Sequence, residues 1–319
     1  MLMQVTMMGG AAHGVNGVGE SGQSADVLDV LVVASHRDFE ITAQCLRNLI
    51  SYFPALRRVV LATDEAHRGR ALVDSLGLGH IPVISDDDLL SAGEAKLGGW
   101  YRQQIIKLRA GEVFSGRMFC VMSGDTLLAR PLSATDLVSP SGRPYLYVNR
   151  YRYPSAHLAY ERRRVRAVAE LLGVMPTTSV ALGDFIADLF CFERDVLEAA
   201  VERLRHRHGP EWTKILDGRG RSCADQERFG EYTLYAVAAL ELMPSRPPVR
   251  VRAESHVLQL HSRNSFNRAT FDAPIVHIVD KSITVDEIAR RARAFGVEIR
   301  PGPTAAPGSG PAPTRSNYR

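Results

Sequence analysis

The chain has 319 residues and a formal net charge of +4, and its composition is 45% hydrophobic and 23% charged. These values are typical of a globular protein with a sizeable core, arranged as one large domain or two small ones. No block of Lys and Arg stands beside interleaved aromatic residues. The mild positive charge therefore favours an anionic small ligand and argues against a nucleic acid as the main partner.

The cysteines and the hydropathy pattern indicate in which cellular compartment the protein is expected. Cys45, Cys120, Cys191 and Cys223 are too widely spaced for a zinc site and are expected to be reduced, buried thiols. The chain shows no basic segment followed by an apolar stretch at its start, and no run approaches the ~20 apolar residues that span a bilayer. The sequence thus predicts no transmembrane segment and a cytoplasmic location.

Both ends of the chain have the composition of disordered segments. Residues 1–25 are rich in Gly and Met without hydrophobic periodicity, and residues 301–319 are dominated by Pro, Gly, Ala and Ser. Such segments bury too little apolar surface to offset the entropy lost on ordering. We expect two disordered tails around one working unit at 26–300, in which no internal repeat is visible.

The first part of this unit alternates apolar runs with amphipathic helical patterns. The runs at 27–34, 58–62 and 81–84 are predicted strands, and the patterns at 38–52 and 68–76 are predicted helices. Apolar strands separated by amphipathic helices predict a parallel sheet with right-handed crossovers. Ligands of such sheets bind at the carboxyl ends of the strands.

The rest of the unit is less regular. A helix at 99–110 leads to an apolar strand at 118–122, which the turn Ser123-Gly124-Asp125 follows directly. Later elements are predicted as strands at 145–148 and 189–192 and as helices at 159–172, 195–207 and 226–242.

Asp125 is the residue with the strongest functional signal. A carboxylate at the mouth of a parallel sheet is placed to bind a divalent cation that neutralises a diphosphate. The alternative is a turn aspartate that only stabilises the loop.

Six motifs, taken in order, resemble a known family. They are ASHRDFE at 34–40, LATDE at 61–65, GWYRQQIIKL at 99–108, MSGDTLLARPL at 122–132, FIADLFCFERDVL at 185–197 and FGEYTLY at 229–235. Their order resembles a bacterial family of uncharacterised glycosyltransferase-like proteins (DUF6492-like) within the nucleotide-sugar glycosyltransferases of the GT-A fold. The resemblance implies a single Rossmann-like α/β domain with a mainly parallel sheet flanked by helices. It also implies a nucleotide-binding half at 26–132, an acceptor-binding half at 133–300, and a uridine- or other nucleoside-diphosphate-sugar donor.

The metal site implied by the resemblance is altered in this chain. The family pattern has an Asp-x-Asp triplet that holds Mn²⁺ or Mg²⁺, whereas this chain has Ser123 at the first position. A neutral hydroxyl is a weaker ligand for a hard cation, so metal dependence is in question. Related enzymes often use a C-terminal histidine as third ligand. That role is carried over to His261, with His277 as second choice because it lies in an apolar run typical of a structural histidine.

The resemblance also implies a set of donor-binding residues. The end of the first strand is expected to contact the nucleoside, Asp64 and Asp86 follow the next two strands, and the helix at 99–108 faces the diphosphate. The resulting candidates are Ala34, Ser35, Arg37, Asp64, Trp100, Arg102, Gln103, Gln104, Lys107, Ser123, Gly124 and Asp125. Arg102 and Lys107 suit a diphosphate by charge, or form a solvated helix face. For Asp64 and Asp86, helix N-capping is an equal alternative.

Two carboxylates are the leading candidates for acid–base chemistry, ahead of Asp225 and Glu227. Inverting sugar transfer needs a carboxylate that takes the acceptor hydroxyl proton, with a pKa raised by burial. Asp188 lies between apolar residues, and Glu231 lies near a predicted helix start, where the helix dipole favours the charged form. Asp188 and Glu231 are ranked together as catalytic residues.

Two further groups of side chains have a functional and a structural interpretation. The basic run at 161–166 suits an anionic partner, but an exposed helix face is the favoured interpretation. The aromatic residues Tyr145, Tyr147, Tyr151 and Tyr153 suit stacking on a sugar, although half of them would pack into the core of a strand.

The sequence therefore predicts a glycosyltransferase that moves a sugar from a nucleotide-sugar to a small-molecule or glycan acceptor. One alternative is a non-catalytic or metal-independent nucleotide-binding relative, motivated by Ser123. A nucleotidyltransferase is disfavoured because no Gly-rich phosphate loop follows the first strand. The sugar, the acceptor, the stereochemistry and the oligomeric state stay open.

Overall fold

The structure is a computed structural model, and it describes residues 27–148, 155–216, 229–243, 251–252, 257–260, 275–278 and 282–295. The two predicted tails lie outside the described residues, as do Tyr151, Tyr153 and Cys223. None of the described helices combines the length and the apolar composition that crossing a bilayer requires.

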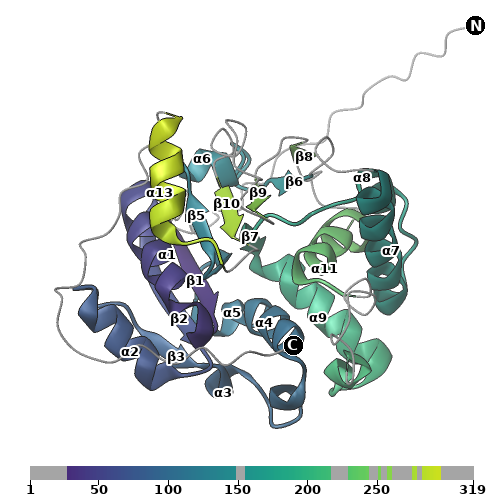
Figure 1. Ribbon diagram of the computed structural model, residues 1–319. Coiled ribbons are helices and arrows are strands. Elements are labelled where there is room, and N and C mark those ends of the chain that lie inside the picture. Colours follow the sequence, from purple (N-terminus) through teal and green to yellow (C-terminus); the bar gives the residue numbers. More distant parts are fainter. Residues whose placement is uncertain are drawn as a thin grey trace, which may run out of the picture.

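A five-stranded sheet with the order β3-β2-β1-β4-β7 forms the centre of the molecule (Figure 1). The first four of these strands run parallel, and β7 is antiparallel to β4. The strands are β1 (Leu28–Ala34), β2 (Leu56–Thr63), β3 (Val83–Ser85), β4 (Met118–Ser123) and β7 (Leu189–Glu193). The predicted α/β architecture with a mainly parallel sheet is confirmed.

The central strand β1 shows why these residues form a sheet core. All seven of its residues are buried, which explains the continuous apolar run instead of an alternating one. Its single charged residue, Asp29, is compensated by Arg57 from β2. The guanidinium Nε and Nη2 donate to Asp29 Oδ1 and Oδ2 at 2.9 and 2.6 Å.

Helices cover both faces of this sheet. Helices α1 and α2 lie on one side, and α4, α9 and α11 lie on the other (Figure 1). Right-handed crossovers require this arrangement, because the chain moves outward from β1 to β3 and then returns past β1 to β4. The main helices are α1 (Phe39–Tyr52), α2 (Ala66–Ser75), α4 (Gly99–Leu108), α7 (Ser155–Leu172), α9 (Arg194–His208), α11 (Glu231–Val237) and α13 (Val285–Ala294). Shorter turns are η1 (His36–Asp38), α3 (Asp86–Leu89), η2 (Glu94–Lys96), α5 (Ala110–Val113), α6 (Ala134–Leu137), α8 (Thr178–Leu182), η3 (Trp212–Leu216) and η4 (Ala238–Leu242).

Two smaller sheets lie beside the central one. One has the order β5-β10-β9, built from β5 (Thr126–Leu128), β10 (Ile275–Ile278) and β9 (Val257–Leu260). The other pairs β6 (Leu146–Tyr147) with β8 (Val251–Arg252). A second hydrophobic cluster joins β5, β10 and α13 to α1, and includes Leu127, Val276, Ile278 and Ile288. The C-terminal elements are thereby packed against the first helix.

Several expected elements differ in detail. The predicted helix at 99–110 is interrupted at Arg109, which separates α4 from α5. The described part of the predicted helix at 226–242 begins at Glu231, and its last turn is a π-helix. Three cysteines are buried free thiols, as expected: Cys45, Cys120 and Cys191. Tyr145 and Tyr147 are both buried, which favours their structural interpretation.

Candidate functional site

The turn after β4 places Asp125 at the carboxyl edge of the sheet. Ser123 pairs with Val33 in the parallel ladder, and the Gly124 amide donates to the Val33 carbonyl at 2.8 Å. A Cβ atom at Gly124 would lie 2.6 Å from the Cβ of Ala34. Glycine is therefore required at this position because the end of β1 passes so close, and the chain turns outward with Asp125 beyond both strands.

A histidine from the far end of the chain lies beside this aspartate. Strand β10 pairs with β5, and the Ile278 amide donates to the Asp125 carbonyl at 3.0 Å. This pairing brings His277 Nε2 to 3.3 Å from Asp125 Oδ2, and His277 Nδ1 to 3.1 Å from Asp188 Oδ2. Burial alone would lower the pKa of His277, but the two carboxylates raise it to about 10. The imidazolium thus bridges two acids.

Asp188 has an unusual backbone conformation. Its φ is +41°, in the left-handed region that L-residues other than Asn, Asp and Gly rarely adopt. Its carbonyl accepts a hydrogen bond from the Ser123 amide at 3.2 Å, just before β7 begins. Such conformations are kept where the surrounding structure fixes them, often at functional sites. The residue is 4% exposed, so it is buried more fully than its position between apolar residues alone indicates.

Lys107 on α4 is the centre of a buried hydrogen-bond network. Its ammonium donates to Glu231 Oε1 at 2.8 Å, to Ser123 Oγ at 3.0 Å and to the Tyr232 hydroxyl at 3.1 Å. Burial disfavours the charged form, yet Glu231 and Tyr232 raise the pKa of Lys107 above its usual range. Three bonds use all three ammonium protons. Lys107 therefore organises the wall of the site, and its contact with a diphosphate stays a prediction.

Helix α7 contributes a buried ion pair to the same region. Arg164 Nη1 donates to Glu161 Oε2 at 2.7 Å, Arg164 Nη2 donates to the Tyr160 hydroxyl at 3.0 Å, and the pair is 4% and 1% exposed. The interpretation of 161–166 as an exposed helix face is therefore wrong for these two residues. The helical spacing of these residues indicates their burial, because Glu161 and Arg164 fall on the same helical face as the buried Val165 and Val168.

These side chains line one cavity of about 240 Å³. It collects eight of the first-choice residues predicted for the site and adds six others, of which His277 was the second choice for a metal ligand. The predicted ones are Trp100, Gln103, Gln104, Lys107, Ser123, Asp125, Asp188 and Glu231, and the added ones are Arg164, Ile186, Gly230, Tyr232, Thr233 and His277. Glu231 is fixed in place because its amide donates to Gln104 Oε1 at 3.2 Å.

The remaining predicted donor residues lie along the same edge, outside the cavity lining. Asp64 Oδ1 accepts from the His36 amide at 2.7 Å, and Ser35 Oγ donates to Asp64 Oδ2 at 3.2 Å. Burial opposes ionisation, but the hydrogen bonds from His36 hold the pKa of Asp64 below its usual value. The side chain of Asp64 therefore fastens the start of η1 to the end of β2, and Arg37 is exposed.

Asp86 and Arg102 form an ion pair beyond β3. Arg102 Nη2 and Asp86 Oδ2 are 3.0 Å apart. Burial raises the pKa of Asp86 to about 6 despite the guanidinium. The N-cap of α3 is Ser85, so capping does not explain Asp86.

Asp125 and His277 fit two positions of a metal site. Their Oδ2 and Nε2 atoms are 3.3 Å apart, near the separation of adjacent ligands that each bind an ion at about 2.1 Å. Within the part of the chain that the structure describes, no group of three or more His, Cys, Asp or Glu side chains is placed to hold a metal ion. His261, the predicted third ligand, lies outside the described residues. His277, the second choice, is the histidine that reaches Asp125.

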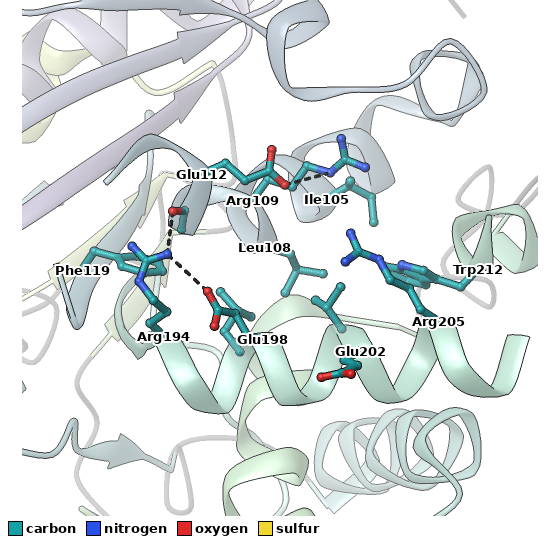
Figure 2. Close-up of a pocket in the computed structure, with 13 residues that line it drawn as sticks. Ile105, Leu108, Arg109, Glu112, Phe119, Arg194, Glu198, Glu202, Arg205 and Trp212 are labelled. Carbon is teal, nitrogen blue, oxygen red and sulfur yellow. Dashed lines mark hydrogen bonds and ion pairs between the residues drawn. The ribbon is translucent and has the colours of Figure 1, made fainter. Parts of the chain in front are cut away.

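A larger cavity, of about 550 Å³, lies between α4 and α9 (Figure 2). Its lining includes Phe119, the second residue of β4, so it lies at the opposite end of that strand from Asp125. Arg194 on its wall braces α5 by donating to the carbonyls of Gly111 and Phe114, and pairs with Glu198 at 3.4 Å (Figure 2). The described lining contains no residue predicted for the site. The smaller cavity is therefore the candidate active site.

Three of the solved structures to which this chain is similar are of glycosyltransferases. The galactosyltransferase LgtC in complex with donor and acceptor sugar analogues is 13% identical at a TM-score of 0.47, and an active-site mutant of LgtC is 12% identical at 0.48. Both comparisons cover 84% of this chain and 94% of the other. Mouse xyloside xylosyltransferase 1, in its apo form, is 16% identical at a TM-score of 0.40, covering 80% and 99%.

A search of curated proteins finds no significant match. The model of one family, described as a family of unknown function (DUF6492), matches residues 25–277. This match spans most of the chain, and the chain therefore belongs to that family.

Proposed function

We propose that the chain is a glycosyltransferase that moves a sugar from a nucleoside-diphosphate-sugar to a hydroxyl of a small-molecule or glycan acceptor. One observation carries the proposal. Asp125 lies at the carboxyl edge of the parallel sheet, 3.3 Å from His277 and in the same cavity as Asp188 and Glu231. Parallel α/β sheets bind ligands at this edge, and the cavity offers both a cation-binding pair and buried carboxylates.

In this proposal the two halves of the domain have different roles. Residues 26–132 bind the nucleotide, with Ser35 and Asp64 near the nucleoside and Arg102 towards the diphosphate. Residues 133–300 complete the cavity with Asp188 and Glu231 and bind the acceptor. The support for this division is positional, because Asp64 and Asp86 follow β2 and β3 at the edge that also carries Asp125.

Asp125 Oδ2 and His277 Nε2 would hold the cation, Mn²⁺ or Mg²⁺, and His277 would give up its proton to do so. Such an ion, when bound, stabilises the negative charge that develops on the leaving diphosphate. Ser123 brings no charge to it because a hydroxyl is neutral, and the hydroxyl oxygen already accepts from Lys107 at 3.0 Å. We therefore expect a weaker metal site than two carboxylates would form.

The transfer step needs a base, and Asp188 is the better placed candidate. The acceptor oxygen bonds to the anomeric carbon while the bond from that carbon to the phosphate oxygen breaks, and the electron pair leaves with the diphosphate. The hydroxyl proton passes to a carboxylate. The Asp188 carboxylate contacts His277, the residue that also reaches Asp125, whereas the Glu231 carboxylate accepts from the Lys107 ammonium on the wall of the cavity. Glu231 is then a positioning residue.

A second candidate function has a specific observation in its favour. Lys107 donates to Ser123 at the position where the family pattern has a metal-binding carboxylate. This arrangement suits a metal-independent nucleotide-binding relative that uses buried cations in place of a divalent ion. The two functions differ in their response to Mn²⁺.

The test is calorimetric and thermal-shift titration with UDP, GDP and their sugar conjugates, with and without Mn²⁺. The glycosyltransferase proposal expects selective binding of one diphosphate-sugar, strengthened by Mn²⁺ and weakened at least about tenfold in Asp125→Ala. Asp74→Ala, which removes an exposed carboxylate on α2, serves as the matched control. Binding that ignores Mn²⁺ favours the second candidate. A protein that binds no diphosphate contradicts both.

A further inference from the structure

Two cysteines face each other in the antiparallel part of the central sheet. Cys120 on β4 is paired with Cys191 on β7 in the ladder that joins these strands. The two thiols are hydrogen-bonded to each other, and burial together with this contact raises the pKa of the Cys120 thiol. Neither cysteine belongs to the described lining of the candidate cavity. The pair is therefore separate from the chemistry proposed above.

The hydrogen bonds of the ladder define the geometry of this pair. The Ser123 amide donates to the Asp188 carbonyl at 3.2 Å, so these two residues form a hydrogen-bonded pair. Hydrogen-bonded and non-hydrogen-bonded pairs alternate along an antiparallel ladder. Cys120 lies three positions before Ser123 in this register, and because three is odd, Cys120 and Cys191 form a non-hydrogen-bonded pair.

A second hydrogen bond gives the same result. Glu193 lies two positions after Cys191, so the two residues share one type of pairing. The Glu193 amide donates to the Tyr235 hydroxyl at 3.1 Å, outside the ladder, as a non-hydrogen-bonded position requires. The Cα atoms of such pairs are typically about 4.5 Å apart, and a disulfide needs about 4.4–6.8 Å. The backbone spacing of the cysteine pair therefore falls within the range that a disulfide requires.

The third described cysteine is engaged elsewhere. Cys45 on α1 donates its thiol proton to the Ser123 carbonyl at 3.8 Å. Cys223 lies outside the described residues. Among the described thiols, Cys120 and Cys191 are the two that the sheet holds in register.

Access to the pair depends on β7. Cys120 and Cys191 are 0% and 3% exposed, and buried thiols react slowly. In the described central sheet, β7 is an edge strand, so local opening of this one strand uncovers both thiols. Hydrogen peroxide is close to water in size and needs only such an opening. We therefore expect the rate of reaction to follow the opening of β7.

We propose that Cys120 and Cys191 are a modification site, where a peroxide oxidises the two thiols to a disulfide that joins β4 to β7. Cys191 lies on the edge strand and reacts first. Its thiolate sulfur attacks one peroxide oxygen, the O–O bond breaks and hydroxide leaves, which forms a sulfenic acid at Cys191. Cys120 Sγ then attacks this sulfur, the S–O bond breaks and a second hydroxide leaves.

The electrons and protons of this reaction balance. The two thiols lose two electrons and two protons, and the peroxide is reduced to two water molecules. An added thiol reverses the reaction by thiol–disulfide exchange. The link would join the strand that ends before Asp125 to the strand that begins after Asp188. Its formation does not depend on sugar transfer.

The experiment treats the reduced full chain with hydrogen peroxide under native conditions. Free thiols are then blocked with iodoacetamide in denaturant, the chain is digested without reductant, and mass spectrometry identifies the linked peptides. We expect one link, between Cys120 and Cys191, which dithiothreitol reverses. Urea at concentrations below the unfolding transition should speed its formation, because it favours the opening of β7.

The link should also be visible in thermal unfolding. A disulfide between positions 120 and 191 closes a long loop and removes conformational entropy from the unfolded chain. The thermal midpoint of the oxidised chain should lie on the order of 10 °C above that of the reduced chain. Dithiothreitol should cancel this difference.

Three alanine variants identify the pair. Cys191→Ala and Cys120→Ala should each remove the link and the rise in thermal midpoint, and either one serves if the other does not fold. Cys45→Ala is the matched control, because Cys45 is as fully buried as Cys120 at 0% exposure but lies on α1. It should keep both the link and the rise in midpoint.

The outcomes decide between this pair and other thiol chemistry. A link that forms in the wild type and in Cys45→Ala, and that is lost in Cys191→Ala, supports the proposal. A link through Cys45 or Cys223 overturns it. Sulfinic acid at Cys120 or Cys191 without a link overturns it as well, as do thiols that stay free when peroxide and low urea are present together.

Discussion

Replacing Lys107 with methionine tests the buried network most directly. The variant keeps an unbranched side chain but removes the ammonium of a residue that is 3% exposed. The Glu231 carboxylate, 2% exposed, then loses its ion-pair partner at 2.8 Å, and Tyr232 and Ser123 lose the donor between them. A buried charge without a partner is the costly element, because water does not replace the lost ammonium.

The expected loss follows from that burial. Breaking one side of a buried ion pair lowers the free energy of unfolding by about 3–5 kcal/mol. In a domain of this size class the midpoint of thermal unfolding should fall by on the order of 10 °C. The double variant Lys107→Met with Glu231→Gln removes both charges, so most of the loss should be recovered.

A second lysine offers a matched control. Lys214 Nζ lies 2.7 Å from Glu211 Oε2, the same geometry, but these side chains are 67% and 69% exposed. Lys214→Met should change the free energy of unfolding by less than about 1 kcal/mol. Urea unfolding followed by circular dichroism compares the variants at equal m-value. The reasoning is refuted if Lys107→Met and Lys214→Met are equally stable, or if the double variant is no better than Lys107→Met alone.

Two further predictions concern the sheet edge. Gly124→Ala brings a Cβ to 2.6 Å from the Cβ of Ala34. We therefore expect the free energy of unfolding, measured in urea, to fall by about 1–3 kcal/mol. An unchanged free energy of unfolding would contradict the close packing. For Asp86 the folded pKa of about 6 lies above the reference value of 3.8, so the folded chain holds a proton that the unfolded chain has already lost. Its contribution to stability is present below pH 3.8 and is lost as the pH rises through about 6. Between pH 4 and pH 7 the free energy of unfolding of the wild type should fall by about 2–3 kcal/mol relative to that of Asp86→Asn. A difference in free energy between the two proteins that does not change with pH would disprove the raised pKa.

The fold was readable from the sequence because its signals are local. The run that became β1 and the apolar second half of β2 are buried throughout, as expected of strands covered on both faces. Amphipathic helices between them fix the parallel order and the carboxyl edge. The placement of Asp125 follows from that edge, since it comes directly after β4.

The contacts of the site were not readable in the same way. His277 was ranked second because the apolar residues around it suggest a structural role, yet the pairing of β10 with β5 places it beside Asp125. That pairing joins segments 152 positions apart in the chain (125 and 277), and no local pattern encodes it. The contacts of Lys107 with Glu231 and Tyr232 were not predicted for a related reason, because those two residues reach it from a helix distant in the sequence.

The large sequence separation between β5 and β10 also has a consequence for the order of folding. The five strands of the central sheet all lie before residue 194, so they can pair before β10 has left the ribosome. His277 joins Asp125 only when β10 and α13 close against α1 through the second hydrophobic cluster. Closing so long a loop is slow compared with local helix formation. Pulse-labelled hydrogen exchange should show the Ile278 amide protected after the amides of β1. We therefore expect the central sheet to form first and the contact between Asp125 and His277 to form last.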